Sequence, residues 1–246
     1  MSAVIFREGK ARMGRNFMGL FAQMGQLGVA ITIFSLIRYF TGQGIHRGMD
    51  IVPFVATGVI MFWTFRNTMQ RVAVTSMMAY NDTFFPQVTP LDVAIARGVV
   101  NITLFVLLGF LAFGIFILVG VSHPIYRPAY VAMLILVSGF YGLFAGMILH
   151  PVLRRFRLFR PVLTVVLRVL LLTSGVFFVI PEIPYLFHDY ALWNPLLHLS
   201  DIMRQEYFGT YSAEYADFGY AMRWLVGLIL FGLITERAAR RSKSFI

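Results

Sequence analysis

The chain has 246 residues, of which 59% are hydrophobic and 13% charged, with a mean hydropathy of +0.75 and a net charge of +10. A water-soluble fold cannot bury that much apolar surface, so the composition excludes a soluble globular protein and predicts a chain that lies in lipid. The basic residues form short clusters between apolar stretches, which argues against a nucleic-acid-binding face, and the absence of cysteine excludes disulfides and thiolate–metal sites.

Six apolar stretches are long enough to cross a hydrocarbon core of roughly 30 Å as helices. They cover about residues 18–40, 51–79, 90–120, 126–150, 161–181 and 219–236. Clusters of Lys and Arg mark the cytoplasmic side of a membrane protein. Here they occur in the N-terminal tail, at 154–160 and at 237–243, so six crossings place all three clusters and both termini in the cytoplasm. We expect one all-α integral membrane domain, 1–246.

Two segments are predicted to lie in the membrane without crossing it. Residues 3–16 mix apolar and basic side chains, which is typical of a helix in the cytoplasmic interface, with an ordinary basic tail as the alternative. Residues 181–215 are too polar to cross and are rich in aromatic side chains. We expect short re-entrant helices there, tolerated in the outer leaflet because their backbone is buried in protein. An interfacial aromatic belt on a surface loop is the alternative.

Arginines within the spans are candidates for function, because an unpaired charge near the bilayer centre costs at least roughly 2.5–3.5 kcal/mol. One helical stripe of span 51–79 is formed by Arg66, Asn67, Gln70 and Arg71. We predict that this stripe faces a polar conduit, with snorkelling to headgroups as the alternative, above all for Arg71. The other predicted pathway residues are Trp63, Tyr39, Arg38 and Arg168. Arg38, near the outer end of its span, is expected to snorkel. A cationic wall would favour an anionic cargo.

A glycine step in span 126–150 predicts a close contact between helices. Gly142 and Gly146 are four residues apart, and Gly139 lies one turn earlier. Small residues at this spacing let two backbones approach closely. The partner helix could belong to the same chain or to a second copy.

Motifs for catalysis and for ATP binding are absent from the sequence. The lysines are Lys10 and Lys243, and neither follows the glycine spacing of a phosphate-binding loop. The sequence contains no Asp-x-Asp pair, His-Glu-x-x-His or Gly-x-Ser-x-Gly motif. We therefore expect that this chain is not an enzyme and binds no cofactor or metal.

The connection after the second span carries a distinctive sequence. It contains Pro86-Gln87-Val88-Thr89-Pro90-Leu91-Asp92, followed by Ile95-Ala96-Arg97. This segment resembles the corresponding loop of the membrane subunits of type-2 ABC exporters, most closely the capsular polysaccharide export permeases. Before the last span, Asn194-Pro195-Leu196-Leu197-His198 is similar to a step of the same family that O-antigen and teichoic acid exporters share.

The resemblance implies a half-transporter of the bacterial inner membrane. It would pair with a second copy of itself and with two separate ATPase subunits, which bind ATP and Mg²⁺. Its cargo would be a lipid-linked acidic capsular polysaccharide, passed on to a periplasmic co-polymerase or adaptor protein. The alternative cargoes are O-antigen, teichoic acid and small lipophilic compounds, and a membrane-embedded glycan or lipid enzyme is the less favoured reading.

The resemblance also implies roles for individual residues. In the family a coupling helix after span two docks on the ATPase, which corresponds here to Asn81, Phe84, Phe85, Pro86, Gln87, Pro90, Leu91 and Asp92. The family's short outer helices correspond to a segment that includes Glu182, Tyr185, Trp193, Asn194, Pro195 and His198. The family's channel is lined chiefly by spans one, two and five, where Arg66, Arg71 and Arg168 lie. Two prolines would stiffen the coupling loop, so that it can pass a rigid-body movement to the membrane helices.

Overall fold

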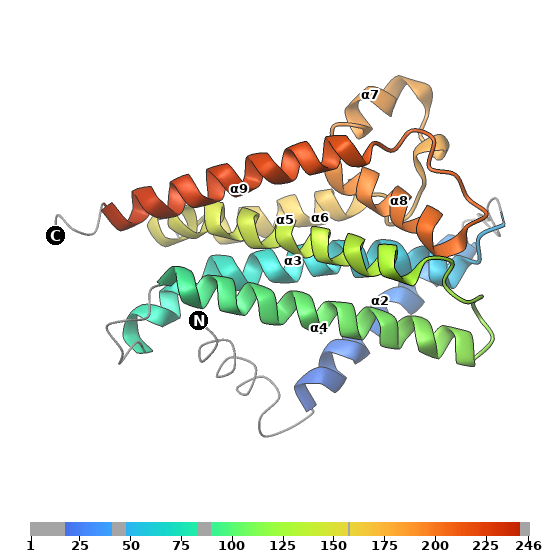
Figure 1. Ribbon diagram of the computed structural model, residues 1–246, viewed down its shortest axis with the longest axis horizontal. Helices are drawn as coiled ribbons and strands as arrows, with labels where there is room; N and C mark the ends of the chain where they lie inside the picture. Colours follow the sequence, from blue (N-terminus) through green and yellow to red (C-terminus); the bar gives the residue numbers. More distant parts are fainter. Residues whose placement is uncertain (1–17, 41–47, 83–89, 157, 242–246) are drawn as a thin grey trace.

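The computed structural model describes residues 18–40, 48–82, 90–156 and 158–241, and the secondary structure of these residues is helical. The long helices are α2 (Met18–Phe40), α3 (Ile51–Asp82), α4 (Pro90–Leu118), α5 (Pro128–Arg155), α6 (Phe159–Thr173) and α9 (Phe218–Arg241). Most of them run along one axis, and α2 crosses them obliquely (Figure 1). The short elements between α6 and α9 are η1 (Ile180–Glu182), η2 (Tyr185–Phe187), α7 (His188–Ala191) and α8 (Pro195–Phe208).

Four described segments are long and apolar enough to cross a membrane. They are Phe21–Phe40, Leu91–Leu118, Pro128–Leu153 and Phe218–Ala238. These segments coincide with four of the six predicted spans, so an all-helical membrane fold is confirmed to that extent. The helices at the other two predicted spans are α3, which carries the polar stripe, and α6, which has 15 residues. A complete crossing takes about 20 residues.

The fifth predicted span, 161–181, is wrong at its C-terminal end. α6 stops at Thr173, and Gly175 follows with a φ of +71°, a left-handed conformation that glycine adopts without a steric penalty. The apolar stretch continues as far as Ile180, but as a buried segment outside any long helix. Hydropathy alone does not separate these two states, because a buried turn and a helix can have the same composition.

α3 is the central helix, and it packs against α2, α4, α5 and α8. Its first half is buried on all sides; Val55, Val59 and Ile60, for example, have no exposed surface. A helix surrounded by other helices is expected to be apolar all round. The side of α3 that carries Trp63 and Arg66 is only half-buried, so the polar stripe coincides with the part of α3 that its neighbours leave uncovered.

The glycine step of α5 is a contact within the chain. A Cβ atom at Gly142 would collide with the carbonyl oxygen of Phe65 in α3, and one at Gly146 would lie 2.7 Å from the carbonyl oxygen of Met69. Glycine at both positions therefore lets the backbones of α3 and α5 approach closely. Of the two possibilities left open by the sequence, the structure shows the intramolecular one.

Successive long helices from α3 to α6 alternate in direction. The end of α3, the start of α4 and the ends of α5 and α9 lie at one end of the molecule (Figure 1). We call it the basic end, because the clusters around Arg155 and Arg237 lie there. The opposite end, here called the distal end, carries α7 and α8 (Figure 1). The predicted interfacial helix, 3–16, and most of the predicted coupling loop, 83–89, lie outside the described residues.

Candidate functional site

Arg38 holds the end of α2 to the distal end of the molecule. Its side chain is 3% exposed, donates a hydrogen bond to the Glu182 carboxylate at 2.9 Å and donates another to the carbonyl oxygen of Phe177. The second Glu182 oxygen accepts a hydrogen bond from the backbone N–H of Val179 at 3.0 Å. Arg38 is therefore buried and paired, and the prediction that it snorkels to the interface is wrong.

Arg204 of α8 holds the segment that follows α6 in place through hydrogen bonds. Its guanidinium group is fully buried and donates hydrogen bonds to three carbonyl oxygens, those of Gly175, Val176 (3.3 Å) and Phe178 (2.9 Å). Carbonyl groups in a buried non-helical segment need such donors. The fork of N–H groups in arginine can serve several acceptors at once. One side chain thus fixes the turn that ends α6.

The two arginines meet over one aromatic ring. The guanidinium carbons of Arg38 and Arg204 lie 4.0 and 3.8 Å from the ring centroid of Phe54, near the start of α3. A buried cation over an aromatic ring is stabilised by the ring quadrupole. Asp201 supplies another buried negative charge beside Arg204 and accepts a hydrogen bond from Tyr211 at 2.9 Å.

We call Arg38, Phe54, Glu182, Asp201 and Arg204 the arginine cluster. The cluster links α2, α3, η1 and α8. The sequence reasoning did not identify Phe54, Asp201 or Arg204 as site residues. The sequence did contain a signal for two of them. Asp201 and Arg204 are three residues apart, so they share one face of a short helix, and the other residues of that helix are largely buried.

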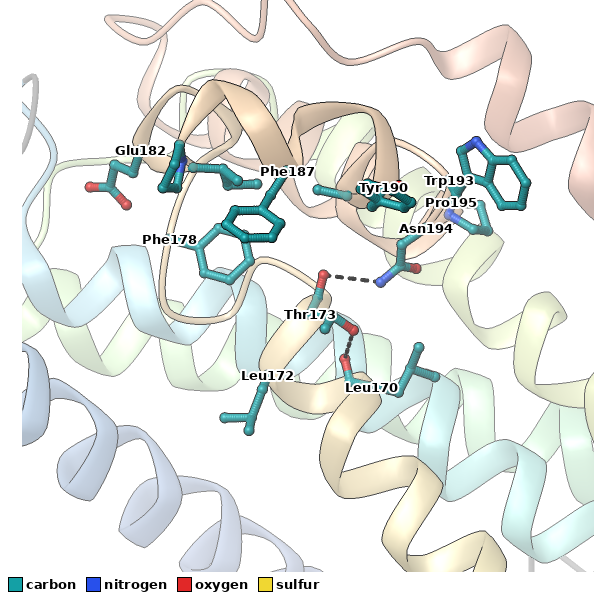
Figure 2. A pocket seen from close by; sticks show the side chains of 13 residues that line it. Leu170, Leu172, Thr173, Phe178, Glu182, Phe187, Tyr190, Trp193, Asn194 and Pro195 are labelled. Atoms are coloured by element: carbon teal, nitrogen blue, oxygen red, sulfur yellow. Dashed lines mark hydrogen bonds between the residues drawn. The ribbon is translucent and has the colours of Figure 1, made fainter.

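The Asn-Pro-Leu-x-His step has a structural role at the distal end. The Asn194 side-chain oxygen caps α8 by accepting a hydrogen bond from the N–H of Leu196 at 3.1 Å, and its amide nitrogen donates to the Thr173 carbonyl at 3.0 Å (Figure 2). Pro195 is the first residue of α8, where its missing N–H costs nothing. The step therefore joins the end of α6 to the start of α8.

His198 completes that connection. Its ring is 4% exposed; Nδ1 accepts from the N–H of Asp217 at 3.0 Å, and Nε2 lies 2.8 Å from the carbonyl oxygen of Leu192. With Nδ1 as the acceptor, Nε2 carries the hydrogen and donates it. At the start of α9, the backbone N–H groups of Tyr220 and Gly219 lower the pKa of Asp217, as is usual for a carboxylate at a helix N-terminus. His198 thus ties α9 to the short helices.

A cavity of about 750 Å³ lies between the end of α6 and the segment around α7 (Figure 2). We call it the distal pocket. Its lining consists of Leu170, Leu172, Thr173, Phe178, Glu182, Ile183, Pro184, Phe187, Tyr190, Ala191, Trp193, Asn194 and Pro195. Phe178 and Phe187 both line it, and Trp193 stands at its edge (Figure 2). Of the predicted outer residues, Tyr185 is 91% exposed and Trp193 75% exposed.

The polar stripe of α3 is brought together as the helical spacing predicts. Arg66 is half-buried, and its Nε atom is buried with no hydrogen-bond partner among the described residues. The Asn67 side chain donates a hydrogen bond to the Trp63 carbonyl at 2.9 Å, and Gln70 is half-buried beside an exposed Arg71. The stripe therefore offers one buried hydrogen-bond donor, the Nε atom of Arg66, that packing among the described residues does not use.

The remaining predicted pathway and coupling residues are less closely grouped. Arg168 is exposed on α6, and Tyr39 is 66% exposed at the end of α2. Leu91 and Asp92 are half-buried in the first turn of α4, where an acidic side chain suits the helix dipole. Pro90 begins α4 and Asn81 lies in the last turn of α3, whereas Phe84, Phe85, Pro86 and Gln87 lie outside the described residues.

The chain resembles known proteins over nearly its whole length. The chain is similar to the capsule polysaccharide export inner-membrane proteins CtrC of Neisseria meningitidis serogroup B and BexB of Haemophilus influenzae, at 24% identity each, over 95% of this chain and 88% of each relative. It is also 23% identical to the polysialic acid transport protein KpsM of Escherichia coli, over 96% of this chain and 92% of that protein. The family model of the ABC-2 type transporter matches residues 1–208. With the helical membrane fold described above, this match over most of its length makes the chain a member of the ABC-2 type transporter family.

Proposed function

We propose that this chain is the transmembrane subunit of an ATP-driven exporter of lipid-linked acidic capsular polysaccharide in the bacterial inner membrane. Two copies form the conduit, and two separate ATPase subunits bind ATP and Mg²⁺. A periplasmic co-polymerase or adaptor protein receives the glycan. The whole chain, 1–246, acts as one membrane domain that carries no catalytic residue and no cofactor of its own.

One observation carries this proposal: the similarity to relatives named for capsule polysaccharide export extends over about 95% of the chain. The absence of a phosphate-binding loop motif from the sequence agrees with a subunit that obtains its energy from a partner. Membership of the ABC-2 type transporter family implies such an ATPase partner.

The membrane topology that goes with this function has six crossings, with α3 and α6 as the second and fifth. The basic end then lies in the cytoplasm together with both termini, because arginine clusters stay on that side. The short elements from η1 to α8 enter the outer leaflet without crossing it. α6 is short for a crossing, and the re-entrant segment compensates by filling the outer part of the membrane next to it.

The polar stripe of α3 is the proposed contact surface for the cargo. A half-buried arginine with an unused donor, followed by a second arginine about one turn later, suits carboxylates on an acidic glycan. Arg168 of α6 adds a third positive charge on an exposed helix face. In a homodimer, these surfaces from two chains would form a cationic wall that favours anions.

Deletion of the encoding gene tests the function directly. We expect the surface polysaccharide to disappear and an acidic lipid-linked glycan to accumulate inside the cell, with the intact gene in trans restoring export. Chemical analysis of the accumulated material identifies the cargo. Normal surface glycan in the deletion strain, or accumulation of a neutral glycan or a small lipophilic compound, would contradict the proposal.

A further inference from the structure

The distal pocket has an apolar lining and the dimensions of a ligand site. Its volume of about 750 Å³ falls within the roughly 300–1,000 Å³ that is typical of small-molecule pockets. Two phenylalanines, two leucines, two prolines and an isoleucine contribute most of the wall. Tyr190 and Trp193, which are 79% and 75% exposed, stand at the rim.

The polar side chains inside the pocket are already engaged with the protein. The Thr173 hydroxyl donates to carbonyl oxygens of its own helix at 3.3 Å, and the Asn194 amide donates to the Thr173 carbonyl at 3.0 Å. Both oxygens of Glu182 accept hydrogen bonds, one from Arg38 and one from Val179. A sugar ring bound here would leave many hydroxyl groups without partners, which is costly in a desolvated site. The interior of the pocket therefore suits a hydrocarbon.

The position of α6 puts this pocket at the depth of lipid tails. α6 follows the arginines of the basic end, which hold its first residues at an interface. Its 15 residues rise about 22 Å, which is short of the roughly 30 Å hydrocarbon core. The end of α6 at Thr173 and the pocket beside it thus lie inside the hydrocarbon region. Val162, Val165 and Val169 are exposed on one side of α6 and lead toward Leu172 at the pocket.

We propose that the distal pocket binds an acyl chain of a zwitterionic membrane phospholipid. None of its described lining residues is basic, so the pocket does not select an anionic headgroup. The rings of Tyr190 and Trp193 would lie at the level of the lipid headgroup, where amphipathic aromatic side chains are favoured. The site holds α7 against α6 through a lipid tail. This inference goes beyond the export function and does not depend on the cargo.

Photolabelling of the full chain tests the site. The protein is reconstituted in phosphatidylethanolamine and phosphatidylcholine vesicles that contain phosphatidylcholine with a diazirine near the end of one acyl chain. After irradiation, mass spectrometry locates the labelled residues. We expect Phe178 and Phe187 to be labelled roughly tenfold more than exposed apolar residues of α2 such as Val29 and Ile33. Equal labelling of the pocket and of α2 would overturn the proposal.

A pocket-filling variant supplies the second measurement. Ala191 lines the pocket, and Ala191→Phe should lower the labelling of Phe178 by roughly tenfold, because excluding about two methylene groups from an apolar site costs that much affinity. Ala129→Phe, at an exposed position at the start of α5, is the matched control and should leave labelling unchanged. If Ala191→Phe does not give a monodisperse protein, Leu170→Trp is the alternative pocket-filling variant. Unchanged labelling in a folded pocket-filling variant, or labelling by an acidic glycolipid but not by phosphatidylcholine, would refute the site.

Discussion

The Nε atom of Arg66 is buried in the central helix without a hydrogen-bond partner among the described residues. If this donor serves an anionic cargo, Arg66→Ala should reduce export by roughly 10- to 100-fold, which corresponds to the loss of one charge-assisted hydrogen bond of about 1.5–3 kcal/mol. Recovery of the complex with its ATPase should stay normal. Surface glycan per cell at matched expression measures the effect, and Arg223→Ala, at an exposed position of α9, is the control. Normal export by Arg66→Ala would exclude this role.

Arg204 is expected to contribute to stability, because it is buried within the arginine cluster. Replacing it with methionine removes the donor for three backbone carbonyls and takes away a positive charge that acts on the buried Asp201. We expect a loss of at least about 3 kcal/mol in the free energy of unfolding, because three buried carbonyl groups lose their donor at a cost of about 1–3 kcal/mol each. Thermal unfolding of the purified protein in detergent measures it as a lower Tm. A Tm for Arg204→Met as high as that of the Arg223→Ala control would contradict this account.

At the scale of helices, the packing of α5 on α3 depends on glycine. A methyl group at Gly142 would press on the carbonyl oxygen of Phe65, whereas one at Gly114 of α4 would meet nothing within 4 Å. We expect Gly142→Ala to destabilise the protein by about 1–3 kcal/mol, as overpacking of a tight contact does. Gly114→Ala should be neutral or slightly stabilising, since alanine favours a helix. The unfolding temperatures of the two variants test this prediction. Equal values would show that the contact between α3 and α5 tolerates a side chain at position 142.

The first turn of α4 is the described part of the predicted coupling element. Asp92 lies there at the basic end, and Asp92→Lys should weaken docking of the ATPase, because it reverses a charge at the proposed interface and opposes the helix dipole. Co-purification of the ATPase measures binding. The same reversal at Asp189→Lys, at the distal end in α7, should leave recovery unchanged. If both variants recover equal amounts of the ATPase and export normally, Asp92 is not part of the interface.

For the molecule as a whole, the orientation in the membrane is the testable quantity. The chain contains no cysteine, so single cysteines can be introduced at Pro86 and at the 91%-exposed Tyr185 without background. A membrane-impermeant thiol reagent added to spheroplasts should label the cysteine at 185 and spare the one at 86. Labelling at 86 from outside would invert the topology and overturn the ATPase-driven account with it.

The sequence predicted most helix limits well but could not reveal how distant residues meet. The starts of α3 and α9 at Ile51 and Phe218 agree with the predictions to within one residue, because a change from polar to apolar composition marks them. The end of α6 was missed because the turn at Gly175 lies within an apolar stretch. Arg38 and Glu182 are 144 positions apart, and hydropathy alone carries no information about such a pair. The stripe around Arg66 was predictable because helical periodicity is local.

The continuity of α3 bears on how a movement of the proposed ATPase would be transmitted through the protein. It is one continuous helix of 32 residues, and it extends from near the ring shared by the two arginines to Asp82, next to the predicted coupling loop. Long helices commonly curve gently, but sharp kinks almost always need a specific cause such as a proline, a π-bulge or an inserted side chain. If the proposed ATPase docks at the coupling loop, its movement would act on a helix whose other end carries the arginine cluster, with no loop in between.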